Sequence, residues 1–149
     1  MKKTICISGL GNIGLPTACV LATSGYEVLG VDTNHQVVER LQTGITCSLE
    51  PNLQDLLKQV IKERTFTASL KPTSANIHII VVPTFLKSNN EPDISCVYEA
   101  IKAIKPHLRP KDLVVIESTC PIGTTDILAR DLKMNCSGVQ VAYCPERVL

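Results

Sequence analysis

Short apolar runs along this chain alternate with longer segments in which an apolar residue recurs every three or four positions. The short runs predict buried strands, and the longer segments predict amphipathic helices. Strands are expected at residues 4–8, 27–31, 66–69, 77–82, 113–117 and 139–143. Helices are expected at residues 11–24, 34–42, 52–63, 94–105 and 123–132, with loops at 46–51 and 83–93. Strand and helix therefore alternate along the whole chain.

This alternation predicts an α/β fold with a doubly wound parallel sheet, because strands joined by helical crossovers pair in parallel and are covered on both faces. The near-continuous apolar run at residues 77–82 is typical of such a doubly covered strand. The expected strand order is 3-2-1-4-5-6, with ligands at the carboxyl ends of the strands. His78 lies inside the apolar run without a polar partner nearby in sequence, so a structural role is favoured over a catalytic one.

The composition indicates one globular domain without a polyanionic or membrane partner. The 149 residues are 44% hydrophobic and 19% charged, with a net charge of +1 and neither a basic stripe nor an acidic tail. These values give no support for nucleic-acid or membrane-surface binding. The apolar start breaks at Ser8-Gly9, too early for a signal peptide, and no segment approaches the roughly 20 apolar residues of a membrane span. We expect a cytoplasmic protein.

The chain has seven cysteines, an odd number, and none of them are spaced as Cys-x-x-Cys. Free thiols in a reducing compartment are therefore expected, and neither a disulfide framework nor a metal site is predicted. Cys120 and Cys144 lie near strand ends, where ligands bind. No histidine lies near either of them in sequence, and nothing local indicates an activated thiolate.

A glycine-rich turn follows the first predicted strand. Gly9, Gly11 and Gly14 stand in a G-x-G-x-x-G spacing, and Asp32 ends the second strand 18 residues later. The first glycine permits a tight turn, the second lets backbone approach a pyrophosphate, and the third lets the helix pack closely. Asp32 suits the ribose hydroxyls and opposes a 2′-phosphate, so NAD is favoured over NADP. The alternative is a glycine-rich turn that binds nothing.

Three further strand-end loops are expected to converge on the same crevice. They cover residues 82–84, 118–125 and 143–147. Each loop also has a purely structural interpretation: Thr84 as a solvated residue, Ser118 or Thr125 as a helix N-cap, and Glu146–Arg147 as an exposed charge pair. Their joint position at successive strand ends favours a functional interpretation.

The whole chain resembles the nucleotide-sugar 6-dehydrogenases, a family that includes the UDP-glucose and GDP-mannose dehydrogenases. The matching runs are residues 9–16, 82–84, 91–93, 117–123 and 144–149. Residues 50–53 and 143–149 are most similar to the branch that oxidises UDP-N-acetyl-D-mannosamine. UDP-glucose and UDP-N-acetylglucosamine remain the alternative substrates. The resemblance implies a Rossmann fold and NAD-dependent oxidation of a sugar 6-hydroxyl to a carboxylate in two steps, for bacterial surface polysaccharide.

The resemblance also assigns roles to individual residues. It implies that NAD contacts the glycine turn and a further set of side chains, which are Asn12, Ile13, Asp32, Thr84, Thr119 and Thr125. Thr119 matches a threonine that positions a catalytic water, and Glu146 matches a glutamate that assists thioester hydrolysis. Glu146, Arg147 and Val148 match substrate-contacting positions. Two departures stand out: Asn12 replaces a usual aromatic residue, and Phe85 replaces a usual proline.

Several parts of the family's enzyme have no match in this chain. The nucleophilic cysteine, the catalytic lysine and asparagine, the central helix and the UDP-binding domain all lie in later segments. We therefore expect residues 1–149 to be an NAD-binding domain that binds cofactor without turnover, within an enzyme that dimerises largely through its central helix. The alternatives are a stand-alone NAD-binding or interaction module and another two-domain dehydrogenase acting on a hydroxy acid.

Overall fold

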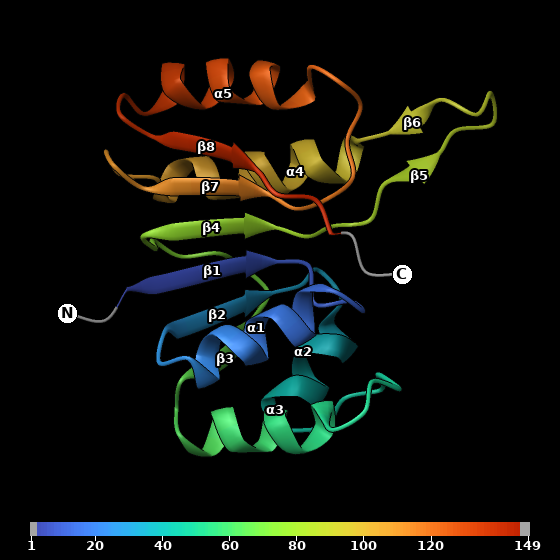
Figure 1. Cartoon of the computed structure of the whole chain (residues 1–149), viewed down its shortest axis with the longest axis vertical. Helices are drawn as coiled ribbons and strands as arrows, with labels where there is room; N and C mark the ends of the chain where they lie inside the picture. Colours follow the sequence, from blue (N-terminus) through green and yellow to red (C-terminus); the bar gives the residue numbers. More distant parts are fainter. Residues whose placement is uncertain (1–2, 147–149) are drawn as a thin grey trace.

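The computed structural model describes residues 3–146 and contains a six-stranded parallel sheet (Figure 1). The strands are β1 (Thr4–Ser8), β2 (Glu27–Val31), β3 (Phe66–Ser69), β4 (Ile77–Ile80), β7 (Leu113–Ile116) and β8 (Gln140–Tyr143). They pair in the order β3-β2-β1-β4-β7-β8, each parallel to its neighbour. The predicted fold class and strand order are confirmed.

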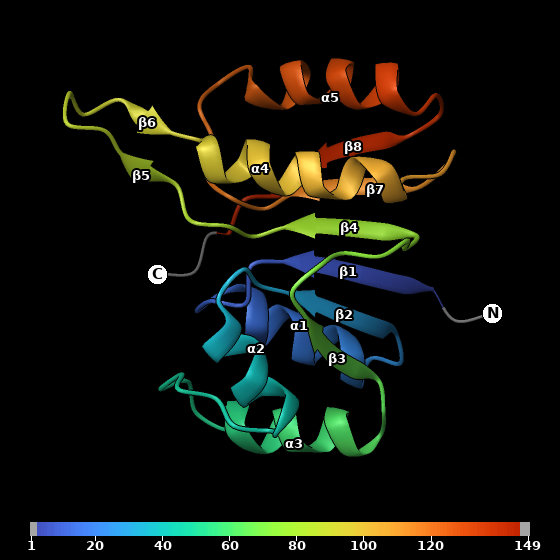
Figure 2. The same cartoon turned by 180° about the vertical axis from the view of Figure 1, so that it is seen from behind.

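Helices cover the two faces of the sheet in different halves. They are α1 (Gly14–Thr23), α2 (His35–Gln42), α3 (Leu53–Lys62), α4 (Ser95–Ile104) and α5 (Thr124–Asn135). In Figure 1, α1 lies in front of the sheet, whereas α4 lies in front of it in the reverse view of Figure 2. Successive strand residues point to opposite faces. Ile80 pairs with Ser8, the neighbour of Ile7. Ile7 therefore packs against α1 on one face, and Ile80 packs against α4 on the other.

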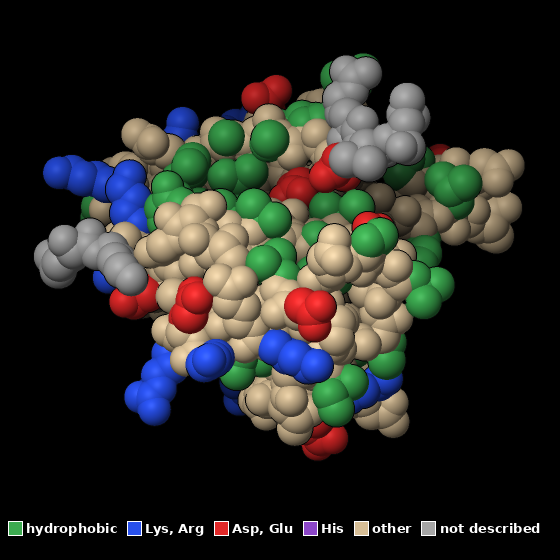
Figure 3. Space-filling model, turned by 60° about the horizontal axis from the view of Figure 1, so that its bottom comes forward, with side chains coloured by type: hydrophobic (Ala, Val, Ile, Leu, Met, Phe, Trp, Pro, Cys, Tyr) green, Lys and Arg blue, Asp and Glu red, His purple; other side chains and the backbone are tan. Residues whose placement is uncertain are grey.

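One part of the sheet has a bare face. In Figure 1, β7 and β8 are drawn with no helix in front of them. Val115 and Ala142 pair across these strands and are only half-buried. Figure 3 shows hydrophobic side chains gathered across the upper half of the molecule on this side. Parallel sheets are normally covered on both faces, so this surface is incomplete as a protein core.

The loop expected at residues 83–93 contains a small hairpin, which the sequence patterns had not predicted. Its strands are β5 (Phe85–Leu86) and β6 (Pro92–Asp93), which pair antiparallel. Two-residue exposed strands leave no periodic pattern to read. The helix expected at residues 94–105 is α4, which ends at Ile104 as the proline after it predicts, and a separate 3₁₀ turn, η1 (Lys105–His107), carries Pro106. Pro is tolerated there because the first turn of a helix needs no N–H donor.

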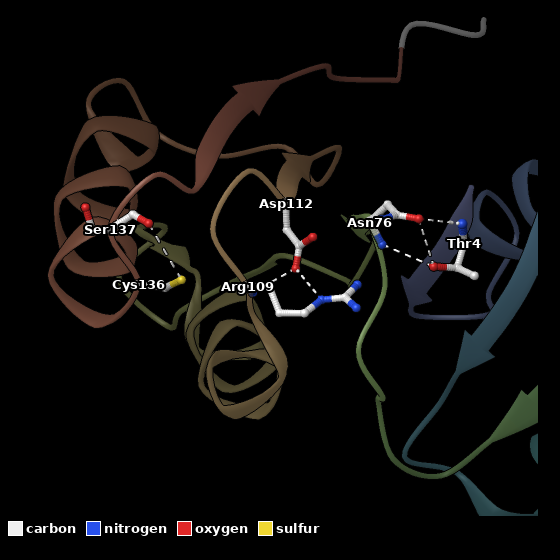
Figure 4. Close-up of polar contacts among 6 residues, drawn as sticks. All are labelled: Thr4, Asn76, Arg109, Asp112, Cys136 and Ser137. Carbon is white, nitrogen blue, oxygen red and sulfur yellow. Dashed lines mark hydrogen bonds and ion pairs between the residues drawn. The ribbon is translucent and has the colours of Figure 1, made fainter. Parts of the chain in front are cut away.

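Polar contacts hold the amino-end edge of the sheet (Figure 4). The Asn76 side-chain oxygen accepts a hydrogen bond from the Thr4 backbone N–H at 3.0 Å. The buried Asp112 carboxylate accepts the Arg109 backbone N–H at 2.8 Å. The first contact joins the loop before β4 to β1, and the second lies within the loop before β7. Both lie at the edge opposite the carboxyl ends, and in such sheets ligands bind at the carboxyl ends.

His78 is fully buried in β4, as its place in the apolar run predicts. Neither ring nitrogen makes a hydrogen bond with any described residue. Burial lowers the pKa of His78 to about 4, which the Asp112 carboxylate only partly opposes. The imidazole is therefore neutral at physiological pH and acts as part of the core.

Across residues 3–146, none of the helices combines the length and the apolar character needed to cross a membrane.

Candidate functional site

The three glycines of the predicted turn have three different environments. Gly9 has φ of +100°, and a Cβ there would overlap the Val81 carbonyl oxygen. A Cβ on Gly14 would overlap the Gly9 carbonyl oxygen. Around Gly11, in contrast, no heavy atom of the described residues other than its own and those of its chain neighbours lies within 4 Å of the Cβ position. Gly9 and Gly14 are thus required by the protein's own packing, whereas Gly11 leaves open space for something outside the chain.

The open space lies at a run of backbone N–H groups that have no partner within residues 3–146. Helix α1 begins at Gly14, three residues later than expected, and its N-cap Ile13 provides no side-chain cap. The N–H groups of Gly11, Asn12 and Ile13 donate to no described residue. A helix N-terminus with free N–H groups and a positive dipole end is suited to a phosphate. The glycine turn therefore fits the diphosphate of a dinucleotide.

Asp32 is fixed beside this turn by backbone donors. Its Oδ2 accepts the Leu10 N–H at 3.0 Å, and its Oδ1 accepts the Asn34 N–H at 2.9 Å. Each carboxylate oxygen keeps a further lone pair, so the group can still accept from a pair of ribose hydroxyls. The hydrogen bond from Leu10 places Asp32 against the glycine turn, whereas a shared cofactor site and the ribose contact stay predictions.

A fourth glycine supports the turn, and the motif had not identified it. A Cβ on Gly30, in β2, would stand 2.6 Å from a Leu10 side-chain carbon and 2.9 Å from the Phe66 ring. Gly30 thus lets Leu10 lie on the sheet directly below the turn. The sequence contains the signal, a glycine inside a strand, which marks a close approach of another group.

Ser118 is neither a ligand-facing residue nor an N-cap, so both interpretations considered for it are wrong. Its buried hydroxyl accepts the Val82 N–H at 2.9 Å and donates to the Val82 carbonyl at 2.8 Å. This bridge takes Val82 out of β4, which ends at Ile80 instead of at residue 82. It ties together the loops that follow β4 and β7.

Thr125 is also not an N-cap, because α5 is capped by Gly123 with φ of +86° and without a side-chain hydrogen bond. Thr84 is half-buried between β4 and β5, and Thr119 is exposed after β7. All three threonines lie at the carboxyl edge of the sheet, together with the glycine turn (Figure 1). Their contacts with NAD stay predictions.

The loop after β7 is joined to Tyr143, the last residue of β8 and the first of the strand-end loop expected at residues 143–147. The Tyr143 hydroxyl accepts the Cys120 backbone N–H at 3.4 Å. Burial raises the pKa of the Cys120 thiol. A raised pKa disfavours the nucleophilic thiolate, which agrees with the expectation that Cys120 is not a nucleophile.

Two carboxylates follow the neighbouring strands β7 and β8. Glu117 follows β7 and is half-buried, while Glu146 follows β8 and is exposed. Burial, reinforced by the nearby negative charge of Glu146, raises the pKa of Glu117. Glu117 had not been identified as a site residue from the sequence. Arg147 and Val148, predicted to contact substrate, lie outside the described residues.

Comparison with known proteins identifies the family of this chain. Residues 3–149 match the model of the NAD-binding domain of the UDP-glucose/GDP-mannose dehydrogenase family. UDP-N-acetyl-D-mannosamine dehydrogenase of Methanococcus aeolicus is 41% identical over 97% of this chain and 34% of its own length. NDP-N-acetyl-D-galactosaminuronic acid dehydrogenase of Ralstonia nicotianae is 40% identical over 99% of this chain and 38% of its own length.

Solved structures agree with the sequence comparison. UDP-N-acetyl-mannosamine dehydrogenase from Staphylococcus aureus superposes with a TM-score of 0.93 at 33% identity, over 98% of this chain and 37% of that one. The chain spans little more than a third of the length of these relatives. It belongs to the UDP-glucose/GDP-mannose dehydrogenase family and has the fold and glycine turn of that family's NAD-binding domain.

Proposed function

We propose that this chain is the cofactor domain of an enzyme that oxidises UDP-N-acetyl-D-mannosamine to UDP-N-acetyl-D-mannosaminuronate with two NAD, for surface polysaccharide. The observation that carries the cofactor role is the glycine turn, where three N–H groups that donate to no residue in the described part of the chain adjoin the fixed carboxylate of Asp32. Support for the substrate comes from the relatives, several of which are UDP-N-acetyl-D-mannosamine dehydrogenases. The Ralstonia relative, an NDP-N-acetyl-D-galactosaminuronic acid dehydrogenase, makes a second N-acetylated sugar nucleotide the other candidate substrate.

NAD, when bound, supplies a hydride acceptor for the sugar carbon. In the proposed site, the amides from Gly11 to Ile13 hold its diphosphate and Asp32 holds its adenosine ribose. Thr84 and Thr125 contact the cofactor, and Thr119 positions the water that hydrolyses the oxidised intermediate. Glu146 takes a proton from that water as general base. Arg147 and Val148 contact the sugar nucleotide.

We further propose that residues 1–149 form the NAD-binding domain of a longer, homodimeric cytoplasmic enzyme. The supporting observations are the share of the relatives' length that the chain spans and the bare sheet face over β7 and β8. Further chain would cover that face and bring the nucleophilic cysteine. The 149-residue chain alone therefore binds NAD and does not oxidise sugar.

Calorimetric titration of the chain with NAD, and separately with NADP, tests the cofactor role. We expect NAD to bind and NADP to bind at least about tenfold more weakly, since a 2′-phosphate would meet Asp32. A folded chain that binds neither would contradict the proposal. Sugar-dependent NADH formation by the chain alone would contradict its role as a partial enzyme.

The substrate is tested on the longer gene product. NADH formation is followed with UDP-N-acetyl-D-mannosamine, UDP-N-acetylgalactosamine, UDP-N-acetylglucosamine and UDP-glucose. Two NADH per sugar with the first of these is the expected result. A longer protein that binds NAD but oxidises none of the four UDP-sugars would instead support a non-catalytic NAD-binding module.

A further inference from the structure

A cavity of about 180 Å³ opens directly beside the glycine turn. Gly11 and Asn12 line it together with Arg40 of α2 and Cys47 of the following loop. Sites that take a whole drug-sized ligand measure roughly 300–1,000 Å³. This cavity is therefore too small for a dinucleotide and suits one part of it.

Arg40 is held over this cavity by two hydrogen bonds. Its Nε donates to the Gln36 carbonyl oxygen at 3.1 Å, and its Nη1 donates to Cys47 Sγ at 2.7 Å. The bond to Gln36 turns the side chain back by one helical turn, toward the start of α2. That end of α2 follows Asp32 and lies at the same sheet edge as the glycine turn. The guanidinium is thus fixed before any ligand arrives.

The charge of the cavity selects an anion. Among the described residues that line it, none is acidic. The guanidinium remains charged at every physiological pH, and the free N–H groups of Gly11 and Asn12 add the positive end of α1. Two positive sources thus border one small volume whose described lining holds no carboxylate. A phosphate oxygen is the group of a dinucleotide that such a volume favours.

We propose that Arg40 is a diphosphate-binding residue of the dinucleotide site, acting together with the amides of the glycine turn. This inference rests on the proposed NAD-binding role. Arg40 contacts the cofactor's phosphate oxygens from the α2 side, opposite the N–H donors. Cys47 acts as a positioning residue, because its sulfur holds the guanidinium in place.

The test compares Arg40→Gln with Arg130→Gln. Arg130 is a matched control, since its Nε also donates to a backbone carbonyl four residues earlier, at 3.3 Å, but from the distant helix α5. Each variant and the original chain are titrated calorimetrically with NAD, ADP and adenosine. Circular dichroism and thermal unfolding establish that the variants are folded.

We expect Arg40→Gln to weaken NAD and ADP binding by about tenfold or more, as for other hydrogen bonds to charged groups. Adenosine, which has no phosphate, should bind both proteins equally, and Arg130→Gln should bind all three ligands like the original chain. Arg40→Lys, which keeps the charge, should lose less affinity for NAD than Arg40→Gln.

A second readout does not depend on any variant. NAD should slow the alkylation of Cys47 by iodoacetamide, measured by peptide mass spectrometry, and leave that of the remote Cys136 unchanged. Equal NAD affinity of Arg40→Gln and the original chain would overturn the inference and leave the proposed function standing. Failure of the original chain to bind NAD would overturn both.

Discussion

At the residue scale, the glycine turn contains two kinds of glycine. Gly9 and Gly14 are demanded by neighbouring carbonyl oxygens, whereas Gly11 borders open space. The spacing of the motif predicts all three without separating them. The two kinds are distinguished by the carbonyl oxygens of Val81 and Gly9, which lie next to Gly9 and Gly14 only in the folded backbone.

This difference predicts opposite outcomes for two alanine substitutions. Gly14→Ala forces a Cβ against the Gly9 carbonyl and should lower the free energy of unfolding by about 1–3 kcal/mol. Gly11→Ala should leave unfolding nearly unchanged and weaken NAD binding, because its methyl group enters the space left for the diphosphate. Denaturant unfolding and NAD titration of both variants check this. Equal loss of stability in both would contradict it.

Asp32 allows a second prediction at this scale. Asp32→Asn keeps a side-chain oxygen for one backbone donor but loses the negative charge. We expect NAD affinity to fall by about tenfold and the preference for NAD over NADP to narrow, because repulsion of a 2′-phosphate is removed. Titration with both cofactors measures the ratio. An unchanged ratio would show that another group sets the preference.

At the scale of elements, the site depends on links between loops. Ser118 binds the backbone of Val82 through two hydrogen bonds, and Tyr143 accepts from Cys120. The periodic patterns predict the strands β7 and β8, in or just after which these residues lie. They do not show which loop side chains bridge the strand ends, because each bridge depends on the register of two strands far apart in sequence.

Ser118→Ala removes the bridge between the loops after β4 and β7. The Val82 N–H and carbonyl then lose their partner, which should lower the free energy of unfolding by about 1–3 kcal/mol and weaken NAD binding. Thr119→Ala is the control, since Thr119 is exposed and its loss should leave the unfolding transition in place. Thermal unfolding of the two variants distinguishes them, and similar melting temperatures would argue against the bridge.

At the scale of the whole molecule, stability is coupled to pH through His78. Its folded-state pKa of about 4 lies below the ordinary value of 6.5, because burial disfavours the charged imidazole. The unfolded chain binds a proton as pH falls through 6.5, and the folded chain does so only near 4. Stability is therefore fully present above pH 6.5 and is lost progressively between pH 6.5 and about 4.

The loss attributable to His78 is of the order of 3 kcal/mol across this window. His78→Val should flatten this part of the pH dependence, whereas the exposed His35→Gln should leave it unchanged. Denaturant unfolding of the three proteins at a series of pH values gives the comparison. If His78→Val keeps the same loss of stability between pH 6.5 and about 4, carboxyl groups and not His78 cause that loss.

The sequence by itself determined the strand order, the glycine turn and the position of Asp32 beside it. The strand order follows from the doubly wound architecture that strands joined by helices imply. The glycine turn and Asp32 follow from one spacing of 18 residues. The tertiary structure alone decided that Arg40 shares a cavity with Gly11, that the charge of Glu146 acts on Glu117, and that Ser118 binds the backbone of Val82 rather than a ligand. Each of these depends on distant segments meeting at the carboxyl edge, where register and packing, and not local pattern, set the distance between side chains.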